Sequence, residues 1–456
     1  MGEKRKMPLW RRKASHRLLA AKSRRRYLVA TIAASFLLLG YPGDRSWPND
    51  ARNGADAWQA ASAMLCDSFS QAVVPGSTRE DFTFTSSYDG STQWAALQVP
   101  SKPPPVAGYP IVIALHGWDA SVGQSSGRDT MISAFGPMAE QQGWLLAAPE
   151  MHGERTSGDT SLAARAAQHD TLDTLAVVRA KYQVDASRIY ITGLSMGGMA
   201  AVVTAAKYPD VFAAAVDYDG ISDLAKWYDE SVLLQSEIAA EAGGTPSEMA
   251  FEYARRSPVS FASNLKHVPL AIIHGQADDV VLPHHATDLY TAVQSYGPDN
   301  VEIHWFAGGH VIPAEYGPDW AAAFFARYTL NTTPHTLSIK TDESKAYYWL
   351  GVRQTGAGHW TTVEATTDDG RQQIVATVTD STSVEVTFDL QQLGFDTVSA
   401  YTVHNVDLST GVTTMSTMTP QAGQIMIAEP SSSHQLTLSC AAIRFPNKVY
   451  LPAVLK

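Results

Sequence analysis

From Ile111 to about residue 330, short continuous runs of apolar residues alternate with stretches of helical periodicity. Each apolar run is about as long as a strand, which is typical of strands buried on both sides of a parallel sheet. We expect strands at IVIALHG, WLLAAPE, RIYITG, AAAVDYDG, VPLAIIHG and VEIHWFAGG, with helices over about 128–142, about 160–182, from Ser195, from about 285 and over DWAAAFFARYTL. This alternation predicts an α/β domain with helices on both faces of a mostly parallel sheet.

The pattern changes on either side of this segment and at one point inside it. Two stretches of period-2 alternation, FTFTSSYD and TQWAALQVP, are separated by a Gly-Ser turn and predict a β-hairpin. Residues 222–265 are helical and contain aromatic residues, and their length exceeds that of a simple crossover, so they predict a cap-like insertion. After Asn331, alternation rich in Thr, Val and Ser predicts a small all-β sandwich, with strands at TLSIKT, AYYWLGVRQT, QQIVATVTD, SVEVTFDL, AYTVHNVD and HQLTLSC.

The N-terminal pattern predicts export. Residues 1–42 hold eleven Lys or Arg and one acid, and this basic block runs into YLVATIAASFLLLGY at 27–41. These fifteen residues are fewer than the roughly 20 that span a bilayer, so they are typical of a signal sequence or a short membrane anchor. SRRRYL also resembles a twin-arginine export signal. We expect an exported, extracytoplasmic protein of bacterial origin, and the pattern leaves secretion and anchoring through residues 27–41 both open.

These patterns divide the chain into four segments. They are an export signal or anchor at 1–43, a linker at 44–80, the α/β domain at 81–331 and a C-terminal β-sandwich at 332–456.

Charge and cysteine content exclude several functions. The chain has a net charge of -11, and without residues 1–42 it holds 23 basic and 44 acidic residues, a balance of -21. Such an acidic body repels nucleic acid, so we expect no nucleic-acid partner. Cys66 and Cys440 are the only cysteines, which excludes a cysteine metal cluster and a disulfide framework and leaves their pairing open. We expect no cofactor and no metal, and the oligomeric state stays open.

The sequence RIYITGLSMGGMA places Ser195 between glycines where a strand is followed by a helix. A Gly-x-Ser-x-Gly turn in this setting exposes the serine hydroxyl above the sheet, as attack on a carbonyl requires. The glycines allow close approach of the backbone, and a helix N-terminus favours negative charge. A simple tight turn is the alternative interpretation, and the strand-turn-helix setting favours a nucleophile.

An acid and a base are expected further along the chain, in that order. Asp278 follows the strand PLAIIHG, and His310 follows the strand VEIHWF on a glycine loop. Both positions suit a site at the carboxyl ends of parallel strands. Asp279 is the rival acid, and the rival bases are His274, His284, His285 and His304.

The remaining site residues are expected around Ser195. The backbone N–H groups of Met196 and Trp118 are the candidate oxyanion-hole donors, the second from the loop LHGWDA. His116 in that loop is interpreted as structural. Trp118, Tyr218 and Trp227 are candidate substrate-binding walls, although core packing explains such aromatic residues equally well.

The segment PEMHGER brings Glu150, His152 and Glu154 close together, which raises a metal site as one interpretation. The spacing is not His-Glu-x-x-His and no further ligand cluster follows, so hydrogen-bonded and ion-paired residues are the better account.

Four motifs together resemble the α/β-hydrolase fold, most closely the catalytic domain of the prolyl oligopeptidase family and related secreted esterases. They are IVIALHGWDA, DASRIYITGLSMGGMAA, SPVSFASNLKHVPLAIIHGQADDVVLP and AGGH. The resemblance covers about residues 80–330 and implies a triad of Ser195, Asp278 and His310, with Met196 and Trp118 at the oxyanion hole. Prolyl oligopeptidases carry a β-propeller before this domain, whereas about 40 residues precede the hairpin here after the signal-like segment.

Three functions are consistent with these sequence features. The first is an exported serine hydrolase that cleaves small or polymeric carboxylic esters, of the feruloyl or polyester type, through an acyl-enzyme. The second is a serine peptidase of the prolyl oligopeptidase family. The third is polymer or carbohydrate binding by the C-terminal module, where Tyr347, Tyr348, Trp349 and Trp360 would form a stacking face or, as is commoner, fill the core.

Overall fold

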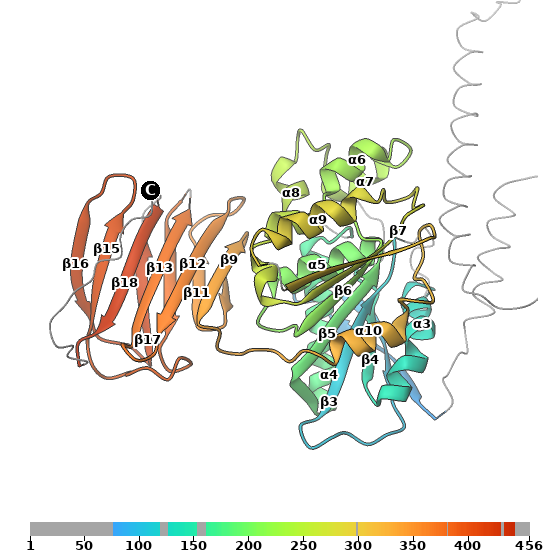
Figure 1. Cartoon of the computed structure of the whole chain (residues 1–456), viewed down its shortest axis with the longest axis horizontal. Coiled ribbons are helices and arrows are strands. Elements are labelled where there is room, and N and C mark those ends of the chain that lie inside the picture. The colour runs from blue at the N-terminus through green and yellow to red at the C-terminus, as the bar shows by residue number, and fades with distance from the viewer. Residues whose placement is uncertain are drawn as a thin grey trace, which may run out of the picture. The chain divides into compact units, whose positions relative to one another are not determined.

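The computed structural model describes residues 76–118, 126–152, 161–297, 300–380, 382–429 and 433–442. Contacts within the chain define two compact units, which are described separately (Figure 1). The first holds most residues up to Leu330, and the second holds Asn331 onward together with the short segments Lys207–Asp210 and Ser263–His267. The export segment predicted at 1–43 lies outside the described residues. In the described part of the chain, none of the helices combines the length and hydropathy needed to cross a bilayer.

The first unit is built on an eight-stranded sheet with the order β1-β2-β4-β3-β5-β6-β7-β8. The strands are β1 (Thr78–Thr85), β2 (Thr92–Val99), β3 (Tyr109–Leu115), β4 (Leu145–Pro149), β5 (Val184–Leu194), β6 (Ala214–Tyr218), β7 (Leu270–Gly275) and β8 (Val301–Phe306). β1 and β2 form the antiparallel hairpin, β2 pairs antiparallel with β4, and all later neighbours are parallel. The parallel strands therefore end at one edge of the sheet, where the candidate site residues follow them.

Helices connect these strands, as the periodicity predicts. They are α3 (Ser126–Gln142), α4 (Arg165–Lys181), α5 (Met196–Lys207), α9 (His284–Gln294) and α10 (Pro318–Phe325). Apolar side chains of α3 and α10 share one core cluster with strand residues; Phe135 and Phe325 within it are fully buried. Because the strands β3 and β4 consist entirely of buried residues, their predicted burial in the sheet is confirmed.

The insertion between β6 and β7 contains α6 (Leu224–Glu230), α7 (Gln235–Ala242), α8 (Ala250–Arg255), η2 (Pro258–Phe261) and η3 (Asn264–His267). Figure 1 shows α6, α7 and α8 grouped at one end of the sheet, near α9. Asp223 is the N-cap residue of α6, the first helix of this group. Its carboxylate accepts hydrogen bonds from the backbone N–H groups of Ala225 and Lys226.

The second unit contains two antiparallel sheets with the orders β10-β11-β14-β17 and β16-β15-β18-β13-β12-β9. The strands are β9 (Thr336–Thr341), β10 (Lys345–Tyr347), β11 (Leu350–Gln354), β12 (Thr361–Asp368), β13 (Gln373–Asp380), β14 (Val384–Asp389), β15 (Tyr401–Asp407), β16 (Thr413–Met418), β17 (Gln424–Glu429) and β18 (Ser433–Cys440). The predicted strand AYYWLGVRQT is divided between β10 and β11, with Tyr348 at a φ of 52° between them. Strands β12, β16 and β17 were not among the predicted strands. Cys440 is buried in this unit, and Cys66 lies outside the described residues.

Candidate active site

The turn between β5 and α5 holds Ser195 in a left-handed backbone conformation, with a φ of 61°. Such a conformation is costly for a residue with a Cβ and persists only where the surroundings enforce it. Here the backbone N–H of Ser195 donates to the carbonyl oxygen of Tyr218 at 2.8 Å, and its carbonyl accepts from the N–H of Met199 at 3.0 Å. The first bond joins the turn to β6 and the second lies in α5, so the sharp turn is held at both ends.

The glycines around Ser195 are required by close backbone approach. A Cβ on Gly193 would lie 2.2 Å from the carbonyl oxygen of Gly197, and one on Gly197 would lie 2.1 Å from that of Leu115. Any side chain at either position would therefore push the turn away from β3. The glycines of the motif are thus explained by packing.

Asp278 and His310 lie within hydrogen-bond distance, as the sequence order predicts for an acid and a base. Nδ1 of His310 is 2.7 Å from Oδ2 of Asp278, and both side chains are buried. Oδ1 of Asp278 accepts from the backbone N–H groups of Val280 and Val281 at 2.9 and 3.0 Å. These bonds orient the carboxylate, which in turn orients the imidazole. Nε2 of His310 is buried and makes no hydrogen bond to the described residues, so it is the ring nitrogen left for chemistry.

Asp219 is a site residue that the sequence analysis missed. It follows β6 at a φ of 48°, and its two carboxylate oxygens accept from the backbone N–H groups of Gly275 and Val311, each at 2.8 Å. Gly275 ends the strand before the Asp278 loop, and Val311 adjoins His310. One side chain therefore holds together the two loops that carry the candidate acid and base. Burial, and next the charge of Asp278, raise the pKa of Asp219 well above its usual range.

Asp217, within β6, is a second buried carboxyl near Ser195. A Cβ on Gly198 would lie 2.2 Å from its Oδ1, and one on Gly220 would lie 2.1 Å from the same atom. Its pKa is raised to about 7 because burial disfavours the charged form. Asp217 therefore packs against Gly198, which lies just after the serine turn. Its carboxyl is uncharged or partly charged at neutral pH.

The rival acid and one rival base occupy different environments. Asp279 is exposed, whereas Asp278 is buried. Nε2 of His274 donates to the carbonyl oxygen of Val281 at 2.9 Å and lies 3.4 Å from Oδ2 of Asp278. Burial lowers the pKa of His274, so its ring is held neutral. Its one N–H group is already hydrogen-bonded to the backbone.

The other rival bases pair with glutamates. Nε2 of His284 and Nε2 of His285 lie 2.7 and 3.2 Å from the carboxylate of Glu230. Nε2 of His304 lies 3.2 Å from Oε2 of Glu302 within β8. The structure therefore brings none of these three side chains to Asp278.

The candidate oxyanion donors lie at the expected elements. Met196 is the first residue of α5, where backbone N–H groups have no partner within the helix. Trp118 follows β3, and the next residues, 119–125, are not described. His116 just before it reaches two carbonyl oxygens, from Nδ1 to Gly117 at 2.8 Å and from Nε2 to Glu150 at 3.0 Å. These contacts support the interpretation of His116 as a residue that shapes the loop.

The three candidate substrate-binding aromatic residues have different environments in the structure. The rings of Trp118 and Trp227 meet edge to face with centroids 6.0 Å apart. Nε1 of Trp227 donates to the carbonyl oxygen of Val280 at 3.0 Å, which links α6 to the Asp278 loop. Tyr218 is fully buried, and its hydroxyl donates to the carbonyl oxygen of Tyr316 at 2.7 Å. This burial argues against a substrate-binding role for Tyr218 and assigns its side chain to the core.

The PEMHGER segment contains paired charges, as expected. Nδ1 of His152 lies 2.6 Å from Oδ2 of Asp170, and Nε2 lies 3.2 Å from Oδ2 of Asp89. Oε2 of Glu150 lies 3.5 Å from Nη1 of Arg128. Glu154 lies outside the described residues.

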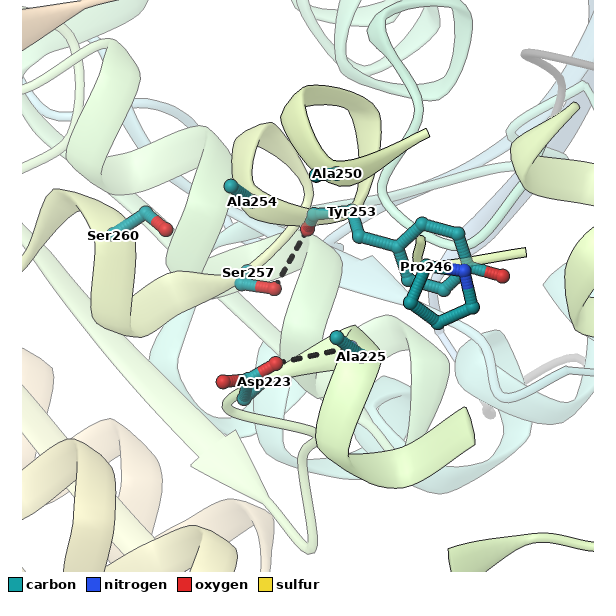
Figure 2. A pocket seen from close by; sticks show the side chains of 8 residues that line it. All are labelled: Asp223, Ala225, Pro246, Ala250, Tyr253, Ala254, Ser257 and Ser260. Carbon is teal, nitrogen blue, oxygen red and sulfur yellow. Dashed lines mark hydrogen bonds between the residues drawn. The ribbon is translucent and has the colours of Figure 1, made fainter. Parts of the chain in front are cut away.

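A small cavity lies within the insertion, and Ser195 is not among its lining residues (Figure 2). It has a volume of about 190 Å³, and its lining residues are Asp223, Ala225, Pro246, Ala250, Tyr253, Ala254, Ser257 and Ser260. The Asp223 carboxylate already caps α6, and the Ser257 hydroxyl donates to the carbonyl oxygen of Tyr253 at 2.7 Å. The Ser257 hydroxyl also accepts from the backbone N–H of Leu224 at 2.9 Å, which links the start of α6 to the end of α8.

Part of this chain is similar in sequence to known proteins. Residues 138–331 match the prolyl oligopeptidase family. Feruloyl esterase B of Neurospora crassa is 32% identical over 182 residues, covering 38% of this chain and 60% of that protein. An uncharacterised peptidase of Bacillus subtilis is 28% identical over 145 residues, covering 32% of this chain and 56% of that protein. The chain thus spans only 60% and 56% of the lengths of these two curated relatives.

Solved structures are also similar to part of this chain. The acylaminoacyl peptidase of Pyrococcus horikoshii superposes with a TM-score of 0.45 at 20% identity, covering 55% of this chain and 42% of that chain. The resemblance predicted from the sequence is confirmed over residues 138–331, which match the prolyl oligopeptidase family. The mainly parallel sheet and its connecting helices confirm the predicted α/β fold.

Proposed function

We propose that this protein is an exported serine hydrolase that cleaves carboxylic esters, with Ser195 as nucleophile, His310 as base and Asp278 as the acid that orients it. The observation that carries the proposal is the 2.7 Å bond between Asp278 and His310, in a domain that also holds Ser195 in a strained turn. A serine hydroxyl, an oriented imidazole and a helix N-terminus are the groups that acyl transfer needs.

The reaction follows the chemistry of these groups. His310 Nε2 accepts the hydroxyl proton as Ser195 Oγ bonds to the ester carbonyl carbon. The N–H groups of Met196 and Trp118 stabilise the resulting oxyanion. The carbon–oxygen bond to the alcohol then breaks, and the alcohol leaves with the proton from His310. Water repeats the sequence on the acyl-enzyme, releasing the acid and restoring Ser195.

The ester preference is supported by the similarity to feruloyl esterase B, which is 32% identical over the matched segment. The substrate would be a small or polymeric ester with an aromatic or short acyl group. Trp118, which is partly exposed and meets the ring of the buried Trp227 edge to face, is the candidate aromatic contact for such a group.

A peptidase is the second candidate, and the family match favours it. The same triad can attack an amide, which differs mainly in its poorer leaving group. The two candidates are separated by turnover of a p-nitrophenyl ester and a p-nitroanilide that carry one and the same acyl group. We expect rapid ester turnover and negligible anilide turnover.

Variants decide whether Ser195 carries the activity. Ser195→Ala should abolish ester turnover, whereas Ser236→Ala, at an exposed serine of α7, should leave it unchanged. Ester turnover that survives in Ser195→Ala would refute the proposal. Anilide turnover comparable to ester turnover in the wild type would assign the protein to the peptidases instead.

A binding function for the second unit has less support. Tyr347 and Trp349 are fully buried in its core. The ammonium group of Lys340 lies over the ring of Trp360, 4.4 Å from its centroid. These residues therefore do not form an open stacking face. Retention of the full-length Ser195→Ala protein on insoluble polysaccharide or polyester would revive this alternative.

A further inference from the structure

Two histidines and a glutamate converge where the insertion contacts α9. Glu230 is the last residue of α6, and His284 and His285 are the first two residues of α9. Oε1 of Glu230 lies 2.7 Å from Nε2 of His284, and Oε2 lies 3.2 Å from Nε2 of His285. One ligand atom from each side chain lies within 4.8 Å of the others. Residues 54 positions apart in the chain thus present two imidazole nitrogens and a carboxylate to one point.

The outer nitrogen of each imidazole also has a partner. Nδ1 of His284 lies 3.3 Å from Oδ2 of Asp288, one turn further along α9. Nδ1 of His285 lies 3.0 Å from Oγ of Ser222. A carboxylate partner such as Asp288 fixes the ring orientation and the tautomer of a metal-binding histidine, so that Nε2 of His284 is left to bind the ion. The cluster therefore resembles a metal site in the outer contact of His284 as well as in its inner contacts.

From this arrangement we propose that Glu230, His284 and His285 bind a divalent transition-metal ion, with Zn²⁺ as the ion that fits best. Two imidazoles and one carboxylate are ligands that Zn²⁺ accepts, and water can complete the coordination. Water has access because the side chains of Glu230 and His284 are 23% and 32% exposed. The proposal departs from the metal-free expectation of the sequence analysis and does not depend on ester hydrolysis.

Protonation of the cluster is compatible with metal binding. Without metal, the backbone N–H of Ser222 donates to Nδ1 of His285, and Nε2–H donates to Glu230. With metal, the proton moves to Nδ1, which then donates a hydrogen bond to the Ser222 hydroxyl instead of accepting one from the Ser222 backbone N–H. The nearby cation, Lys226, is paired with Asp288 at 2.6 Å, which offsets its repulsion of the ion.

The position of the cluster predicts what the ion does. It joins α6 to α9, and Trp227 of α6 bonds to Val280 beside Asp278. A bound ion would therefore stabilise the attachment of the insertion to the loop that carries the candidate acid. The cluster Asp219, His274 and Asp278 also brings ligand atoms together, but it belongs to the candidate active site and carries no separate proposal.

The test uses the full chain after treatment with EDTA and dialysis. Titration with Zn²⁺ by calorimetry should show saturable binding of about one ion per chain, and Zn²⁺ should raise the melting temperature. His284→Gln and Glu230→Gln should each weaken binding by at least about 100-fold, as expected when a ligand is removed. Both residues are partly exposed, so these variants should fold, and circular dichroism of each variant checks this.

The matched control is His304→Gln, which also removes a histidine paired with a glutamate on the surface. It should bind Zn²⁺ as the wild type does. Co²⁺ gives a second readout, since visible absorption typical of nitrogen and oxygen ligands should appear in the wild type and not in His284→Gln. The absence of saturable Zn²⁺ binding to the wild type, or binding of equal strength in both cluster variants, would overturn the proposal.

Discussion

Oδ2 of Asp219 accepts a hydrogen bond from the backbone N–H of Val311, the residue that follows His310, at 2.8 Å. Its other oxygen accepts from Gly275, which precedes the Asp278 loop. Asp219 therefore sets the distance between the loops of the candidate acid and base. It touches neither the substrate nor the reacting atoms, so it is a positioning residue.

Replacing Asp219 tests this positioning role. Asp219→Ala should lower kcat for ester turnover by about 10- to 100-fold with little change in KM, because misplacement of a catalytic group by about 1 Å costs roughly 100-fold. The steady-state parameters of purified, folded variant provide the measurement. Asp279→Asn, at the exposed neighbour of Asp278, is the control. Equal kcat in Asp219→Ala and wild type would contradict the role.

Replacing Asp278 tests the acid. Asp278→Asn should lower kcat by about 10³- to 10⁴-fold, because an amide no longer stabilises the imidazolium and favours the wrong tautomer of His310. Asp279→Asn should stay within about 2-fold of the wild type, since that side chain is exposed. The opposite ranking of the two variants in ester turnover would exchange the acid assignment.

Gly197 tests the close packing of the serine turn. Gly197→Ala should lower the free energy of unfolding by about 1–3 kcal/mol, because its Cβ would lie 2.1 Å from the carbonyl oxygen of Leu115. Gly297→Ala is the matched control, since a Cβ there meets nothing within 4 Å. Denaturant unfolding of the two variants measures the difference. Equal stabilities would show that the turn can yield.

Asp217 should make stability fall as the pH rises. Its pKa is raised to about 7 by burial, from 3.8, so the folded protein keeps a proton that the unfolded chain loses. Between about pH 4 and pH 7 this group therefore lowers the free energy of unfolding, by a total on the order of a few kcal/mol. In Asp217→Asn this loss should be absent. The free energy of unfolding is measured for the variant and the wild type from pH 4 to pH 8. The same pH dependence in both proteins would contradict the raised pKa of Asp217.

His152 should contribute stability that is lost at higher pH. Burial alone lowers its pKa, but hydrogen bonds and charges of Asp170 and Asp89 outweigh burial and raise it above 6.5. The contribution is complete below about pH 6.5 and disappears as the pH rises through the folded-state pKa. The stability difference between wild type and His152→Gln, measured by denaturant unfolding, should therefore shrink over that range. His335→Gln, at a well-exposed histidine, is the control.

The predicted strands of the first unit depended on burial, which the sequence records directly. A strand covered on both faces is continuously apolar, and β3 and β7 are entirely buried. The second unit was less predictable. All residues of β16 except Met418 are exposed, so no apolar alternation marks that strand.

By itself, the sequence determined the α/β-hydrolase fold and the three candidate triad residues, because apolar runs and the Gly-x-Ser-x-Gly turn act over a few neighbouring positions. Only the tertiary structure decided which side chains meet: the role of Asp219 between two loops, the burial of Tyr218 and the convergence of Glu230 with His284 and His285. The physical reason is that these contacts join strand ends and helix ends that are distant along the chain. Their geometry follows from the packing of the whole sheet and insertion, which no local pattern encodes.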